Sequence, residues 1–230
     1  MAETALIVGA GSGLSAALAR LFAQEGMRIA LAARTPDKLA ALCKATGARS
    51  YRCDAAKRDE VEQLFTALGA DLGTPDIVVY NPSARARGPI AELDPDEVQQ
   101  ALQVSCFGGF LVGQQAARAM LARGSGSILF TGASASVKGY ARSAPFAMGK
   151  FGLRGLAQSM ARELAPKNIH VAHFVIDGGI RRADDPRSNE RGPDGLLEPD
   201  AIARTYLDVH RQHRSAWTAE IELRPWVEKY

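Results

Sequence analysis

The sequence has few of the features that mark secreted, metal-binding or nucleic-acid-binding proteins. Its 230 residues include three cysteines, Cys43, Cys53 and Cys106, which are too few and too isolated for a disulfide framework or a zinc site. The four histidines have no third ligand at metal spacing, so we expect no bound metal. The formal net charge is only +3 and the basic residues form no tail, so nucleic acid is not an expected partner.

Long uninterrupted hydrophobic runs are absent as well. The uncharged segment 4–19 is broken by three glycines, and the uncharged segment 98–117 contains five glutamines. Neither composition suits the hydrocarbon core of a membrane, where unpaired polar groups are costly. No basic residue precedes Arg20, so the apolar residues 5–8 do not resemble a secretory signal. We therefore expect a soluble, cytoplasmic protein with no membrane partner.

What the sequence does contain is a regular alternation of two hydrophobic patterns. Short apolar runs typical of buried strands are followed by segments with apolar residues at helical spacing. This alternation predicts an α/β protein with a single doubly wound parallel sheet, a Rossmann-type three-layer sandwich. The expected strands are residues 5–8, 27–33, 50–53, 77–80, 127–130 and 169–176, and the expected helices include residues 14–25, 37–45, 94–122 and 146–164.

The length and composition are those of one globular domain, which we expect to span residues 1–230. With 47% hydrophobic and 23% charged residues, the chain can form one ordinary core. Residues 184–199 combine proline, glycine and charge, which predicts a loop on the substrate side. Within residues 215–230, Ile221 and Leu223 alternate with charged residues, which predicts a C-terminal strand and tail.

A glycine-rich turn lies between the first expected strand and the first expected helix. It reads Val8-Gly9-Ala10-Gly11-Ser12-Gly13-Leu14-Ser15 and fits G-x-x-x-G-x-G with serine as the third small residue. Glycines at such a turn let backbone N–H groups approach a pyrophosphate at the helix N-terminus. We therefore expect a dinucleotide here, held by Gly9, Gly11, Ser12, Gly13 and Leu14.

The second and third expected strands end in residues that bear on the kind of dinucleotide. An NAD-type fold would place an acid after the second strand, but this chain has Ala32-Ala33-Arg34-Thr35 there. Arg34 can bind a 2′-phosphate, which favours NADP over NAD, although a solvated loop arginine is the alternative. Asp54 follows the third strand, where it either accepts a hydrogen bond from the adenine amino group or caps a turn.

Together these residues resemble the short-chain dehydrogenase/reductase family, over nearly the whole chain. Asn81 and Pro82 stand in the segment where the family has N-N-A-G, and Lys150 stands at the lysine of Y-x-x-x-K. Gly178 stands at the glycine of the P-G turn that follows the sixth strand. The resemblance implies an NADP-dependent oxidoreductase acting on a small carbonyl or alcohol. It also implies Asn81, Lys150 and Gly178 at the cofactor, and a homodimer or homotetramer.

The proton-transfer residues of that family are replaced in this chain. In the family a tyrosine donates a proton to the carbonyl, a serine orients the carbonyl, and an asparagine anchors a relay water. Here the tyrosine position holds Phe146, the serine position falls on Ala133, and the asparagine position falls on Ser105. The chain is therefore expected to be a divergent member that lacks the catalytic tyrosine.

Several possibilities remain for the catalytic chemistry. Besides Lys150 and Phe146, the candidate catalytic residues are Ser134, if the strand register shifts by one, and Tyr140, as a relocated acid. Water or a group of the substrate is a further proton source. The alternative function is an NADP-binding pseudoenzyme that acts as a sensor or oligomeric partner. Two arginine pairs near the expected strand ends are either contacts for an anionic substrate or solvated loop residues: Arg85 with Arg87, and Arg181 with Arg182.

Overall fold

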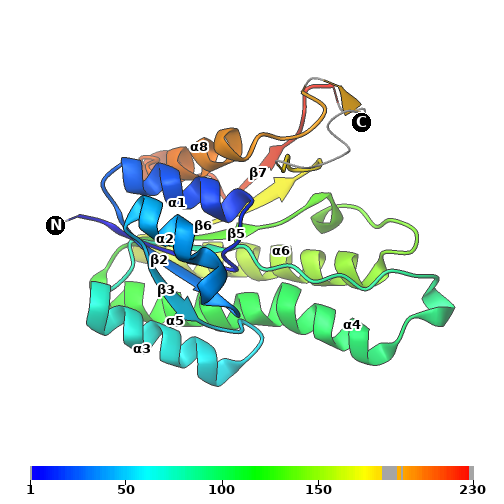
Figure 1. Ribbon diagram of the computed structural model, residues 1–230, viewed down its shortest axis with the longest axis horizontal. Helices are drawn as coiled ribbons and strands as arrows, with labels where there is room; N and C mark the ends of the chain where they lie inside the picture. Colours follow the sequence, from blue (N-terminus) through cyan, green and yellow to red (C-terminus); the bar gives the residue numbers. More distant parts are fainter. Residues whose placement is uncertain (1, 183–190, 193, 228–230) are drawn as a thin grey trace.

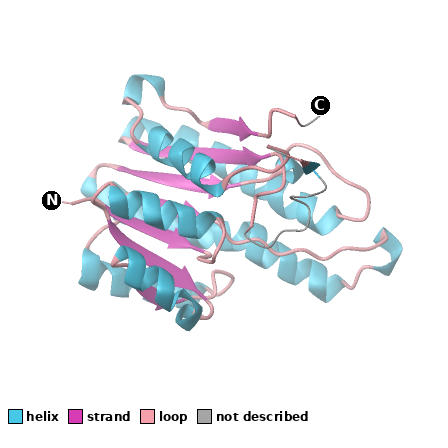
Figure 2. Cartoon of the chain, turned by 45° about the horizontal axis from the view of Figure 1, so that its top comes forward, coloured by secondary structure: helices cyan, strands magenta, loops and turns pink. Residues whose placement is uncertain are grey.

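The computed structural model describes residues 2–182, 191–192 and 194–227. Within them, seven parallel strands form one sheet through the middle of the molecule (Figures 1 and 2). They are β1 (Thr4–Val8), β2 (Arg28–Ala33), β3 (Arg49–Arg52), β4 (Ile77–Tyr80), β5 (Gly126–Thr131), β6 (Ile169–Ile176) and β7 (Glu220–Leu223). Their spatial order is β3-β2-β1-β4-β5-β6-β7, and every neighbouring pair is parallel. The predicted doubly wound α/β fold is confirmed.

Helices cover both faces of this sheet (Figure 1). On one face lie α1 (Leu14–Gln24), α2 (Ala40–Thr46) and α8 (Pro199–His210), and on the other lie α3 (Arg58–Leu72), α5 (Gly108–Arg123) and α6 (Ala144–Leu164). Successive residues of β1 and β4 alternate between the two hydrophobic layers, so that Ile7 packs on one side and Leu6 on the other. Because both faces are buried, these strands read as continuous apolar runs in the sequence.

The helix expected over residues 94–122 is divided by a wider turn. α4 (Pro95–Leu102) passes into a π-helical turn (Gln103–Phe107) and then into α5. Ser105 lies in this turn, fully buried, and its hydroxyl bonds both the N–H and the C=O of Ala84, at 3.1 and 3.2 Å. A π turn changes the helical period by one residue, which hydrophobic spacing does not reveal. Residues 36–39 similarly form a 3₁₀ turn before the short α2.

The C-terminal part of the chain is described only in part. β7 forms where the alternating pattern predicts a strand, and it pairs with β6 at the edge of the sheet. Of the loop expected over residues 184–199, positions 184–190 and 193 lie outside the described residues. No helix in the described part of the chain combines the length and the apolar composition needed to cross a lipid bilayer.

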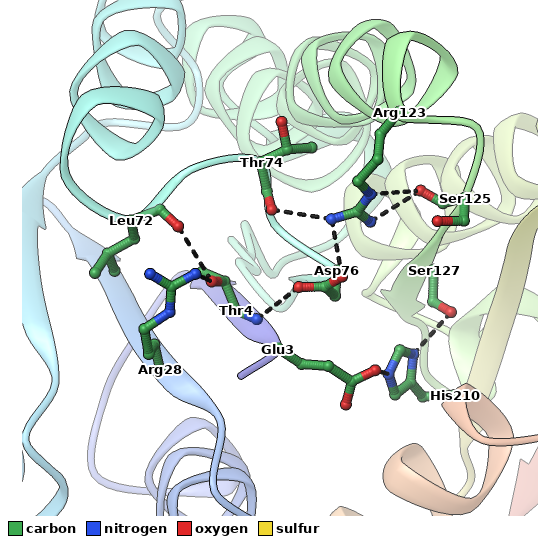
Figure 3. Close-up of polar contacts among 10 residues, drawn as sticks. All are labelled: Glu3, Thr4, Arg28, Leu72, Thr74, Asp76, Arg123, Ser125, Ser127 and His210. Atoms are coloured by element: carbon green, nitrogen blue, oxygen red, sulfur yellow. Dashed lines mark hydrogen bonds and ion pairs between the residues drawn. The ribbon is translucent and has the colours of Figure 1, made fainter. Parts of the chain in front are cut away.

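A network of polar side chains closes the amino-terminal end of the sheet (Figure 3). The Asp76 carboxylate accepts the N–H of Thr4 at 2.7 Å and pairs with the Arg123 guanidinium at 2.8 Å. The imidazole of His210, on α8, lies 2.9 Å from the Ser127 hydroxyl on β5. These contacts tie the strand starts together. In open parallel sheets ligands bind at the opposite, carboxyl end, where the strand order reverses.

Candidate active site

A cavity of about 850 Å³ opens at the carboxyl ends of β1, β4, β5 and β6. At one end it is lined by the glycine-rich turn, and at the other by Phe146 and Lys150 of α6. The expected cofactor residues Asn81 and Gly178 also line it, because each directly follows or lies near the end of one of these strands. Parallel strands bring these separate sequence segments to a single edge. The lining residues are Gly9, Gly11, Ser12, Gly13, Leu14, Ser15, Asn81, Ser83, Arg85, Thr131, Gly132, Ala133, Phe146, Lys150, Ile176, Gly178, Gly179, Ile180 and Arg182.

The glycine-rich turn has the geometry of an anion cradle. Gly9 has a φ of +80°, and a Cβ at this position would lie 2.7 Å from the backbone nitrogen of Pro82. Gly13 precedes α1 without a side-chain cap, and the first turn of the helix holds no acidic residue. The space around the turn is open, since a Cβ at Gly11 or Gly13 would meet nothing within 4 Å, and both glycines line the cavity. Such a helix start suits a phosphate group.

Two hydrogen bonds connect this turn to the end of β4. The Ser15 hydroxyl donates to the Gly9 carbonyl at 3.1 Å and accepts from the Asn81 amide at 2.8 Å. Ser15 is buried, and its hydroxyl links the turn to the residue after β4, a contact that a third glycine could not make. The replacement of glycine by serine at this position is thus compatible with a dinucleotide turn.

Arg34 lies between two further hollows beside the turn. One, of about 710 Å³, is lined by Gly11, Ser12, Arg20, Arg34 and Lys38 among others, with no acidic residue among its described lining residues. The other, of about 340 Å³, is lined by Arg34, Asp54 and Asn81. Three cations therefore line the larger hollow, where a 2′-phosphate is expected, and Arg20, which also lies 3.8 Å from the Asp200 carboxylate, and Lys38 were not singled out from the sequence. The residues present fit a dinucleotide that carries this phosphate.

Asp54 is held by a local contact as well as facing the smaller hollow. One of its carboxylate oxygens accepts the N–H of Ala56 at 3.1 Å, which is the turn-capping role. The same residue lines the hollow. Both of the roles considered from the sequence are therefore compatible with its position, and a contact with adenine stays a prediction.

Lys150 is a fully buried lysine at the floor of the cavity. The residue is 2% exposed, and its ammonium donates a hydrogen bond of 2.8 Å to the carbonyl of Thr131, at the end of β5. Burial, and then the positive charge of Arg85, lower the pKa of Lys150 to about 7. Lys150 is thus not a solvated surface lysine, and its pKa near 7 lets the group exchange a proton near neutral pH.

The Phe146 ring lies against an arginine that comes from another segment, with Lys150 close by. The ring is buried in the cavity wall, with the guanidinium carbon of Arg85 at 4.2 Å and the Lys150 nitrogen at 6.0 Å from its centroid. The face of an aromatic ring attracts a cation at these distances. The sequence shows Arg85 only as one of several loop arginines, so this stack is a feature of the fold.

The remaining candidate catalytic residues do not line the cavity. Ala133 lines the cavity. Ser134, the next residue, begins a 3₁₀ turn; it is half-buried and is not among the lining residues. Tyr140 is 48% exposed on the loop before α6 and likewise does not line it. The structure therefore brings together Lys150 and Phe146, but not the two hydroxyl groups that were considered as replacements for the tyrosine.

Comparison with known proteins identifies the family to which this fold and cavity belong. The family model described as short chain dehydrogenase matches residues 3–182, which is more than half of the chain. The chain belongs to the short-chain dehydrogenase family. The resemblance seen in the glycine-rich turn and Lys150 is thus confirmed, and the family is one of oxidoreductases.

Three relatives show how far the likeness to this short-chain dehydrogenase extends. A crystal structure of a short-chain dehydrogenase from Rhodopseudomonas palustris is 39% identical, covers 97% of this chain and 99% of that chain, and has a TM-score of 0.84. A variant of actinorhodin polyketide ketoreductase, solved with NADPH, is 25% identical, with 100% and 98% covered and a TM-score of 0.90. The 3-oxoacyl-(acyl-carrier-protein) reductase MabA of Mycobacterium tuberculosis is 27% identical, with 81% of this chain and 74% of that protein covered.

Behind the floor of the cavity of this short-chain dehydrogenase, a half-buried polar network joins α6 to the edge of the sheet. Arg154, one turn after Lys150, forms two 2.7 Å bonds with the Glu220 carboxylate on β7. Glu220 also contacts the imidazole of His173 on β6 at 3.0 Å. His173 is 1% exposed and lies so close to Gly132 that a Cβ there would overlap its ring. The sequence does not predict this network, because no local pattern links residues so far apart in the chain.

Acidification is expected to destabilise the protein through His173. Burial lowers the pKa of its imidazole to about 4, while the unfolded chain has an ordinary value near 6.5. The unfolded state therefore binds more protons below pH 6.5, and stability falls as the pH drops toward 4. From this pKa difference we expect the free energy of unfolding to be lower at pH 4.5 than at pH 7 by about 2 kcal/mol. Urea unfolding at pH 7 and pH 4.5 measures it.

Two variants assign this pH dependence to the buried imidazole. His173→Asn should show a smaller difference between the two pH values, whereas His213→Asn, at an exposed histidine, should keep the full difference. An unchanged difference in His173→Asn would contradict the assignment.

Proposed function

We propose that the protein is an NADP-dependent oxidoreductase that acts on a small carbonyl or alcohol substrate. The observation that carries this proposal is one continuous cavity, which runs from the uncapped glycine-rich turn to the buried Lys150. A phosphate cradle and a group that can exchange protons are thereby placed in the same space. Relatives of this chain solved with NADP or NADPH support the choice of cofactor class.

Each part of the cofactor has residues in this site that fit it. Gly9, Gly11, Ser12, Gly13 and Leu14 would hold the pyrophosphate, and Arg34, with Arg20 and Lys38 beside it, would hold the 2′-phosphate. Asp54 would face the adenine, and Asn81, Lys150 and Gly178 would face the nicotinamide half. When bound, the reduced cofactor supplies the hydride.

Carbonyl reduction also needs a proton, and we assign its delivery to Lys150. Phe146 has no proton to give, and Ser134 and Tyr140 do not line the cavity. The Lys150 ammonium does line the cavity, and its pKa near 7 makes transfer to a developing alkoxide favourable at neutral pH. Burial, and to a smaller extent the positive charge of Arg85, keeps that pKa low.

Binding of NADPH and NADH, measured by calorimetry, tests the cofactor assignment. We expect NADPH to bind more tightly, and Arg34→Ala to weaken NADPH binding by about 10- to 100-fold with little effect on NADH, since charge-assisted hydrogen bonds to the 2′-phosphate are lost. Lys44→Ala, at an exposed lysine of α2 that does not line the hollow, is the matched control. Equal affinity of the wild-type protein for the two cofactors would overturn the assignment.

A second candidate function is favoured by the replacement of the hydroxyl-bearing positions by Phe146 and Ala133. It is an NADP-binding pseudoenzyme that acts as a sensor or oligomeric partner. A homodimer or homotetramer is part of either proposal, and large apolar side chains exposed on and around α5 and α6 support it. These are Phe107, Phe110, Met148 and Phe151. Tight NADPH binding without turnover of any carbonyl in a broad panel would favour this second function.

A further inference from the structure

Thr131 is the last residue of β5, and helices on both sides of the sheet bind it. Its carbonyl accepts the Lys150 ammonium at 2.8 Å, from α6 on one side. Its hydroxyl lies 2.9 Å from the phenol of Tyr206, which belongs to α8 on the other side, where α1 also packs (Figure 1). The residue is 6% exposed and lines the cavity. The Thr131 hydroxyl thus belongs to the side of the sheet that carries the glycine-rich turn and α1.

Tyr206 is a buried phenol with a fixed ring. It is 0% exposed, and the ring stacks on that of Phe174, on β6, with the two centroids 3.6 Å apart. Burial raises the pKa of Tyr206, so the phenol keeps its proton at neutral pH. Among the described residues, Thr131 is the one hydrogen-bond partner of this phenol.

The buried phenol decides the direction of the hydrogen bond between the two hydroxyls. If Thr131 were the donor, the phenolic proton would be buried without an acceptor, which costs free energy. Tyr206 is therefore the donor, and the Thr131 oxygen is the acceptor. A hydroxyl that accepts one hydrogen bond can still donate another. Because Thr131 lines the cavity, its proton is a donor for a ligand that binds there.

Building on the proposed function, we propose that the Thr131 hydroxyl donates a hydrogen bond to the carboxamide oxygen of the nicotinamide, and that Tyr206 is the positioning residue that directs it. The proposed function puts the reacting carbonyl beside the Lys150 ammonium, which reaches Thr131 from the α6 side. The hydroxyl lies on the opposite side, toward the turn from which the dinucleotide would extend. The nicotinamide ring carries one good acceptor, the oxygen of its carboxamide, because its ring nitrogen has no free lone pair.

This contact would orient the nicotinamide ring. The carboxamide lies on one edge of the ring, so a donor at a fixed place selects one rotation of the ring about its bond to the ribose. The two rotations present different faces of the ring to the substrate. The Thr131 hydroxyl would therefore help to hold the ring with one face toward the Lys150 ammonium, which is a positioning effect.

Calorimetric titration with three ligands tests this contact without turnover. The ligands are NADP⁺, its thionicotinamide analogue, in which a weakly accepting sulfur replaces the carboxamide oxygen, and 2′,5′-ADP, which lacks the nicotinamide half. We expect Thr131→Val to weaken NADP⁺ binding by about 3- to 10-fold, the value of one neutral hydrogen bond, and to leave 2′,5′-ADP binding unchanged. Binding of the thionicotinamide analogue should weaken less. Thr131→Ser keeps a hydroxyl and should restore NADP⁺ binding.

Tyr206→Phe tests the positioning role, because it removes the phenolic hydroxyl and keeps the ring that stacks on Phe174. We expect NADP⁺ binding to weaken by about 2- to 5-fold, with no further loss when this change is added to Thr131→Val, since both changes act on one contact. Thr205→Val is the matched control, because its hydroxyl bonds the Ala201 carbonyl within α8 and the residue does not line the cavity. It should leave all three affinities unchanged.

The outcomes separate this inference from the proposed function. If Thr131→Val binds NADP⁺ as tightly as the wild-type protein does, the inference is overturned and the cofactor assignment stands. This holds also if that variant raises only the KM of a carbonyl substrate. If Thr131→Val loses 2′,5′-ADP as well, its fold is damaged, and equal losses of NADP⁺ and 2′,5′-ADP in Tyr206→Phe would then overturn the inference. If the wild-type protein binds neither ligand, the proposed function fails and this inference fails with it.

Discussion

Phe146→Tyr is expected to raise the rate of NADPH-dependent carbonyl reduction by about 10²- to 10⁴-fold, the usual contribution of a positioned general acid. The new phenol would lie in the cavity wall, one helical turn before Lys150, whose ammonium would lower the pKa of that phenol. Residues four apart share one face of a helix, so the two groups would act on the same reacting atom. Single-turnover consumption of NADPH with a saturating carbonyl substrate measures the chemical step directly.

Phe146→Leu is the matched control for this experiment. It removes the ring, and with it the platform of Arg85, without adding a proton donor. We expect its rate to stay at or below that of the wild-type protein. A Phe146→Tyr rate no higher than wild type would show that proton donation does not limit the reaction. Activity that appears only in Phe146→Tyr would instead favour the pseudoenzyme.

Lys150→Ala is expected to lower kcat/KM by about 10²- to 10⁴-fold, since it removes the assigned proton donor. The wild-type rate of carbonyl reduction should also fall as the pH rises through about 7, because the Lys150 ammonium then loses its proton. Arg85→Ala should move this fall to higher pH, because the positive charge that destabilises the ammonium is removed. Profiles of kcat/KM against pH for the three proteins measure both effects.

The variant Lys150→Arg distinguishes the loss of the proton donor in Lys150→Ala from a loss of folding or cofactor binding. Arginine keeps the positive charge and can bond the Thr131 carbonyl, but it does not release a proton near neutral pH. It should therefore restore folding and cofactor binding without restoring the fall in rate near pH 7. A Lys150→Arg profile identical to that of the wild type would contradict the assignment of Lys150.

Most of the fold and of the cofactor half of the site could be predicted from local patterns. A buried strand such as β1 shows itself as an apolar run, and a turn that must approach a phosphate needs glycines such as Gly9 and Gly13. The chemical step was harder to predict. Ala133 and Ser134 are neighbours in the chain, and only the backbone after β5 decides which of them reaches the cavity. One residue of register is beyond what a sequence pattern resolves.

The sequence by itself determined the layered α/β fold, the glycine-rich turn, and the absence of a tyrosine four residues before Lys150. Each of these is a property of adjacent residues. Only the tertiary structure decided that Arg85 lies on Phe146, and that His173, Glu220 and Arg154 meet behind Lys150. Those contacts join segments far apart in the chain, so they depend on how strands and helices pack. Packing therefore places the charge of Arg85 near Lys150, where it contributes to the lowered pKa of that lysine.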